Sequence, residues 1–165
     1  MKIITLKNIF LGIALILVQQ GFAQTNPLIK PINTIFDNYI GLKDALIIPD
    51  GKQASVAAKV LLTNLTALPA SGLNTQQTAL VEKLKFDSRH ISEVNLVAHQ
   101  REHFASLSNN LFILLKDIKL NQKTIYRQYC TMKHQYFLRT TADGKDPYMG
   151  MANCSKVKQT LPAVK

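Results

Sequence analysis

The chain has 165 residues and carries 20 Lys or Arg against 10 Asp or Glu, which gives a formal net charge of +10. This length suits one domain that buries a core of its own and needs no disulfide staples. The few acidic residues form no paired-carboxylate arrangement, and the sequence holds no phosphate loop, dinucleotide fingerprint or nucleophile elbow, so we predict that the protein is not an enzyme.

The first 23 residues have the features of an export signal. Two lysines precede an apolar run over residues 9–18, and the small-x-small triplet 21–23 forms a cleavage box before Gln24. The run is shorter than the about 20 apolar residues that a membrane-spanning helix needs. We therefore expect a signal peptide over residues 1–23 and a soluble mature protein that is periplasmic or secreted.

Residues 24–122 predict four amphipathic helices. Apolar residues recur at helical spacing over approximately 32–48, 52–67, 74–91 and 95–118. Pro49, Asp50 and Gly51 break the chain after the first of them. Asn74 followed by Gln77 has the spacing of a capping box, and Asn95 is a candidate cap for the fourth helix. Short joints between four such helices predict an all-α fold, an antiparallel four-helix bundle.

Residues 123–165 form a segment rich in Cys, Met and Tyr in which the helical pattern fails. "TIYRQYC" predicts a short strand or an extended stretch, "TTADGKDPYMG" has the composition of turns, and "NCSKVKQTL" suggests a last helical turn. We expect an irregular segment that packs on the bundle as part of the same domain.

Positive charge is concentrated toward the end of the chain. Residues 116–165 hold ten Lys or Arg and only three acidic residues. In an exported protein this balance suits a solvated basic face, an anionic membrane surface or an acidic partner, and we do not expect a nucleic acid.

Cys130 and Cys154 are the only cysteines, and two interpretations of them remain open. Export favours a disulfide, which would contribute roughly 3 kcal/mol in the chain-entropy model. The alternative is a soft-metal site, because thiolates and thioethers select Cu(I) over hard cations. The further candidate ligands near the cysteines are Met132, Met149, Met151 and His134.

His99 and His103 lie four residues apart on a predicted helix and therefore share one face. Two imidazoles at this spacing can chelate zinc or copper, although a histidine pair on a helix surface also occurs without a metal. The stretch "HQREH" is not the metalloprotease motif H-E-x-x-H, because Gln100 stands where the general-base Glu is needed.

Several blocks taken together resemble the DUF3347 family: "GLKDALIIPDGKQASVAAKVLLTNL", "QREHFASLSNNLFILLK", "IYRQYCTM" and "DPYMGMANC". The resemblance covers about residues 35–157. This family occurs as small exported proteins and also fused to the periplasmic adaptor subunits of copper/silver efflux pumps. The resemblance therefore implies a carrier or sequestrant of Cu(I) or Ag(I), with an efflux-pump adaptor as a possible partner.

The resemblance also implies a ligand set. Cys130 and Met132 match a Cys-Pro-Met block of the family, and Cys154 matches the end of a Pro-Tyr-x-Gly block that includes a methionine, here Met149 or Met151. His134, His103 and His99 are secondary candidates. The chain departs from the family where Thr131 replaces the proline, Tyr129 a histidine, Asp146 an asparagine and Ser155 a glycine. The alternative without a metal is a disulfide-stapled helical module that docks on a membrane or a pump partner.

Overall fold

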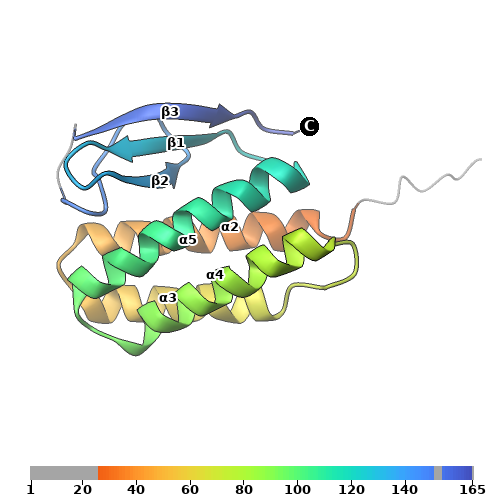
Figure 1. The fold of residues 1–165 in the computed structure, drawn as a ribbon, viewed down its shortest axis with the longest axis horizontal. Helices are drawn as coiled ribbons and strands as arrows, with labels where there is room; N and C mark the ends of the chain where they lie inside the picture. Colours follow the sequence, from red (N-terminus) through yellow and green to blue (C-terminus); the bar gives the residue numbers. More distant parts are fainter. Residues whose placement is uncertain (1–25, 151–153, 165) are drawn as a thin grey trace, which may run out of the picture.

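The structure is a computed structural model that describes residues 26–150 and 154–164 (Figure 1). The export signal predicted for residues 1–23 lies outside the described residues. Within the described ranges, no helix has both the length and the apolar content that a membrane span requires.

Four helices form the body of the protein: α2 (Ile29–Ile47), α3 (Gly51–Thr66), α4 (Thr75–Glu93) and α5 (Val97–Ile118). Each packs against the next along the chain, which confirms the predicted four-helix bundle (Figure 1). The capping box is also confirmed, because Asn74 and Gln77 each accept from the backbone N–H of the other.

The predicted cap of the last helix is wrong. Leu96 occupies the N-cap of α5 and makes no side-chain hydrogen bond. The side chain of Asn95 instead places Oδ1 3.2 Å from Ser55 Oγ, in the corner between α3, α4 and α5. The Asn95 side chain, which the local sequence predicts to cap the helix, therefore makes a tertiary contact instead.

The prediction of an all-α fold with an irregular C-terminal segment needs correction. Residues after the bundle form a three-stranded antiparallel sheet of β1 (Ile125–Cys130), β2 (Gln135–Arg139) and β3 (Ser155–Leu161), in the order β2-β1-β3. The strand expected at "TIYRQYC" is confirmed as β1. The helical turn expected at "NCSKVKQTL" is wrong, because those residues contain β3.

Two features of the strands explain why the sequence shows no alternation of polar and apolar residues. The pairing of β1 with β3 shifts register between Arg127 and Gln128, so a bulge interrupts the period of two. Arg127 itself lies over aromatic rings, 4.6 Å from the centre of Phe112 and 3.9 Å from that of Tyr136. A charged residue thus occupies a packing position. In addition, β3 is almost entirely exposed.

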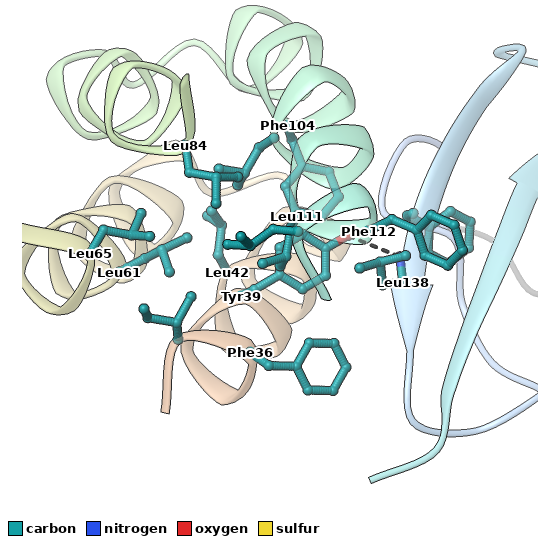
Figure 2. Packing of buried hydrophobic residues seen from close by; sticks show 14 of the residues in the cluster. Phe36, Tyr39, Leu42, Leu61, Leu65, Leu84, Phe104, Leu111, Phe112 and Leu138 are labelled. Carbon is teal, nitrogen blue, oxygen red and sulfur yellow. Dashed lines mark hydrogen bonds between the residues drawn. The ribbon is translucent and has the colours of Figure 1, made fainter. Parts of the chain in front are cut away.

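The sheet is attached to the bundle through a buried tyrosine of α2. The Tyr39 ring stacks on Phe104 with centroids 5.1 Å apart, and its hydroxyl accepts from the backbone N–H of Leu138 in β2 at 3.0 Å (Figure 2). Ser108 Oγ donates to the Phe104 carbonyl, so the Tyr39 hydroxyl donates to Ser108 at 2.7 Å. Burial raises the pKa of Tyr39, which keeps this hydroxyl protonated.

We expect Tyr39→Phe to lower the free energy of unfolding by about 1–3 kcal/mol, because it leaves the buried Leu138 N–H without an acceptor. Tyr126→Phe is the control, since the Tyr126 hydroxyl makes no hydrogen bond within the described residues and should change stability little. Urea denaturation followed by circular dichroism measures both. Equal stability of the two variants would contradict the role of Tyr39 in joining the sheet to the bundle.

Candidate metal centre

The two cysteines meet at one end of the sheet. Cys130 is the last residue of β1, and Cys154 directly precedes β3. Because the two strands are antiparallel and Cys130 pairs with Ser155, the cysteines are close, and the Thr131 N–H donates to the Cys154 carbonyl at 3.2 Å. The two sulfur atoms and a carboxylate oxygen of Asp146 all lie within 4.8 Å of one another, and the structure assigns no disulfide to the two cysteines.

Asp146 enters the cluster from the loop after β2 and is fully buried. Its Oδ1 accepts from the backbone N–H groups of Tyr148 at 2.7 Å and of Met149 at 3.3 Å. Its Oδ2 is buried as well. Both thiols are placed to hydrogen-bond to the Asp146 carboxylate, which helps to raise their pKa. An ion that displaced the two thiol protons would face the same carboxylate.

Two arginines lie close enough to the cluster to sense the charge of Asp146. Burial lowers the pKa of Arg101, and Asp146 opposes that shift. Burial also lowers the pKa of Arg139, and the nearby charges of Asp44 and Asp146 oppose it. The Arg101 guanidinium is fixed by donation to the Leu46 carbonyl at 2.8 Å. The two arginines therefore place positive charge near the Asp146 carboxylate.

The environment holds protons on both thiols in the absence of a metal. Burial raises the pKa of Cys154 to about 12, with a further contribution from the Asp146 carboxylate. The pKa of Cys130 is raised by the same two causes, burial first. Because the thiolate is the reactive form of cysteine, these sulfurs are poor nucleophiles at neutral pH. A metal ion that displaces the protons would reverse this preference.

The geometry suits an ion between the sulfurs. Two metal–sulfur bonds of about 2.3 Å span at most about 4.6 Å, so sulfurs within 4.8 Å need little movement to share an ion. A disulfide requires an S–S distance of about 2.05 Å, so the two sulfurs would have to move closer together than a shared ion requires. Two thiolates with one carboxylate form a donor set in which the soft ligands dominate.

The other predicted ligands are placed differently. Met132 lies in the turn after β1 with 57% of its surface exposed, and Met149 is half-buried against the hydrophobic core. His134 is exposed, with Nδ1 2.9 Å from the Tyr129 hydroxyl. Met151 lies outside the described residues. His99 and His103 are grouped with His90, apart from the sulfur cluster.

Asp146 is the member of the cluster that sequence reasoning missed. From the sequence alone, an isolated acidic residue in a turn-rich stretch is expected to lie in a solvated loop. The available signal was the departure from the family pattern, in which an asparagine stands at this place before Pro147-Tyr148. Only the packing of the loop against the cysteines shows that the carboxylate is buried.

Comparison with known proteins gives one family and one partial relative. Residues 35–123 match the family described as "Protein of unknown function (DUF3347)". The chain is 32% identical over 84 residues, 51% of its own length, to the "Glutathione-independent glyoxalase hsp3101" of Schizosaccharomyces pombe, and the match spans 34% of that protein. No solved structure matches. The sulfur cluster lies beyond the residues that the family match covers. Since that match includes more than half of the chain, the protein belongs to the DUF3347 family.

Proposed function

We propose that this protein is an exported soft-metal-binding protein that holds Cu(I), or Ag(I), through Cys130 and Cys154, as a carrier or sequestrant in copper homeostasis or efflux. The observation that carries the proposal is the group of two thiols and the Asp146 carboxylate within 4.8 Å, of which Cys130 and Asp146 are buried and Cys154 is half-buried. The efflux context comes from the resemblance to domains fused to pump adaptors and counts as analogy.

The donor set favours a soft ion, because two thiolates outnumber the single carboxylate. Two thiolates and Asp146 carry three negative charges, and Cu(I) brings one positive charge. Arg101 and Arg139 lie close enough to offset part of the remaining negative charge. Met149 packs beside the loop and offers a thioether if the loop adjusts, and Met151 is the alternative thioether from the same stretch. Burial of the Cys130 thiol limits the access of oxidants to one side of the bound ion.

We propose a non-catalytic role. Nucleophilic catalysis needs a thiolate at working pH, and the raised pKa of both cysteines opposes it. The likeness to a protein named as a glyoxalase covers about a third of that protein.

Delivery to a partner would use the basic surface near the site. Lys156 and Lys158 are exposed on β3, and Lys133 lies in the exposed turn that follows Cys130. An acidic surface on an efflux-pump adaptor, or an anionic membrane, would be attracted to this edge of the sheet. β3 is also an edge strand, so its free side can pair with an extended segment of a partner.

The test is a titration of reduced protein with Cu(I) in competition with a chromophoric Cu(I) chelator. The proposal predicts one tightly held ion per chain in the reduced protein and none after oxidation of the cysteines. A thiol count on protein purified from the periplasm without reductant separates the alternative. No free thiols together with no copper uptake would establish the disulfide-stapled interaction module instead.

We expect the Cu(I) affinity to rise with pH throughout the neutral range. Because the pKa of Cys154 is about 12 and that of Cys130 is also raised, both thiols must release a proton when the ion binds. Release of two protons predicts an increase of about two log units in the binding constant per pH unit. Chelator competition at pH 6, 7 and 8 measures the slope. A constant affinity over this range would mean that the thiols are not the ligands.

A further inference from the structure

A second cluster of potential ligands lies on the side of α5 that faces α4. His90 comes from the last turn of α4, and His99 and His103 come from the first turns of α5. One ring nitrogen of each lies within 4.8 Å of the others. The His103 ring is 4.7 Å from that of His90 and 4.9 Å from that of His99, between centroids. Three half-buried imidazoles thus meet at one point.

The corner that holds these histidines is fixed by buried polar contacts. Gln100, fully buried, donates from Nε2 to the Gly51 carbonyl at 2.9 Å and to the Val94 carbonyl at 2.6 Å. Ser55 Oγ donates to the same Val94 carbonyl at 2.6 Å. The glutamine in "HQREH" therefore locks the joint between α4 and α5, which sets the positions of the histidines on either side of it.

Asp87 prepares one of the histidines for metal binding. This carboxylate is buried, and its Oδ1 lies 3.1 Å from Nδ1 of His103. An ionised carboxylate only accepts hydrogen bonds, so Nδ1 carries the proton and Nε2 keeps its lone pair for a ligand. Glu102 lies near His99 in the same way, 3.4 Å from Nδ1. A carboxylate behind a histidine is the usual outer contact of a histidine that binds a metal.

We propose that His90, His99 and His103 form a second metal site, which takes a divalent ion that prefers imidazole, Cu²⁺ or Zn²⁺. Three neutral nitrogen donors leave one coordination position open on a tetrahedral ion. Because the site has no soft sulfur ligand, it suits Cu²⁺ or Zn²⁺ better than Cu(I). The general affinity order places Cu²⁺ above Zn²⁺ at such a site.

This site is independent of the sulfur cluster. Figure 1 shows α5 between the sheet and α4. Cys130 ends β1 and Cys154 directly precedes β3. On the sheet side of α5, Arg101 and Ala105 line a cavity of about 320 Å³ together with Tyr148, whereas His99 and His103 meet His90 of α4. The proposal therefore does not rest on copper binding by Cys130 and Cys154.

The histidine rings must move only slightly to bind an ion. Metal–nitrogen bonds of about 2.1 Å place tetrahedral ligand atoms about 3.4 Å apart. The rings of His90 and His103 lie nearly parallel, 14° apart, so one has to tilt for its nitrogen to converge with the others. His90 is only half-buried, and Phe86, which contacts its ring at 4.3 Å, is 56% exposed, so this tilt meets little resistance.

The experiment titrates Zn²⁺ into the mature chain carrying Cys130→Ser and Cys154→Ser, by isothermal titration calorimetry. The sulfur site cannot bind Zn²⁺ in this variant. Absence of Zn²⁺ binding would therefore overturn the histidine site without bearing on the copper proposal. We expect one Zn²⁺ per chain. His90→Ala and His103→Ala should each weaken binding by more than the 10- to 100-fold that loss of an outer partner typically costs. His134→Ala, an exposed histidine on the sheet, is the matched control and should bind as before.

Asp87→Asn tests the outer contact. It keeps the shape of the side chain and removes its charge, so Zn²⁺ affinity should fall by about 10- to 100-fold while one ion still binds. If the double serine variant does not fold, NMR of the histidine side chains in the reduced native chain replaces calorimetry. On addition of Zn²⁺, the imidazole signals of His90, His99 and His103 should shift, and that of His134 should not. Absence of Zn²⁺ binding, or binding that survives the His90 and His103 substitutions, would overturn the site. Cu²⁺ that failed to displace Zn²⁺ would overturn the proposed order.

Discussion

The double variant Cys130→Ser, Cys154→Ser is expected to lose Cu(I) affinity by at least about a thousandfold, because it removes both soft, chargeable donors and leaves one carboxylate. The serine hydroxyl is smaller than the thiol and does not ionise near neutral pH. The fold should survive, because the strands pair through their backbones and the structure assigns no disulfide to the two cysteines. Chelator competition measures the affinity, and circular dichroism checks the fold.

Met132→Leu is the matched control for the double cysteine variant. It removes a sulfur only two residues from Cys130, but this side chain is 57% exposed in the turn after β1. The structure therefore predicts a small effect, whereas the sequence pattern alone predicts a ligand. If Met132→Leu weakened Cu(I) binding as much as the cysteine substitutions do, the buried cluster would not be the whole site.

Gly51→Ala is expected to cost about 3 kcal/mol of stability or more, because the added methyl group would meet backbone that cannot move aside. A Cβ built at Gly51 lies 1.9 Å from the carbonyl oxygen of Asn95. Gly51 is the first residue of α3, and its own carbonyl receives the hydrogen bond of Gln100. The substitution would push α3 away from the joint between α4 and α5.

Gly41→Ala is the control for this prediction. Gly41 lies within α2, and no atom comes within 4 Å of a Cβ built there. Alanine has the higher helix propensity, so this variant should be more stable by about 0.5–1 kcal/mol. Thermal and urea denaturation measure both variants. A Gly51→Ala protein as stable as the parent would show that the close approach of α3 to Asn95 is not required.

The helical body was predictable because its signals are local. Apolar residues at helical spacing and the capping box of Asn74 with Gln77 fix the helices within a few residues. The sheet was not predictable in the same way. A bulge beside Arg127 and an exposed edge strand remove the alternation that marks strands, and Arg127 fills a packing position through contact with aromatic rings.

The candidate site was predictable in part. The predicted export signal and the clustering of sulfur in the last segment pointed to Cys130 and Cys154, and the structure brings these two together. Met132 and His134 instead lie in the exposed turn between β1 and β2, where the alternation of strand side chains that would place them on the face of Cys130 no longer holds. The burial of Asp146 and the joining of His90 to the pair on α5 are tertiary facts without a local signal.

X-ray absorption at the copper edge of the reduced, Cu(I)-loaded protein tests the central proposal most directly, because it identifies the atoms bound to the ion. We predict at least two sulfur neighbours at about 2.3 Å, and their loss in the double cysteine variant. A first shell made only of nitrogen and oxygen in the native protein would contradict the proposal that Cys130 and Cys154 hold the ion.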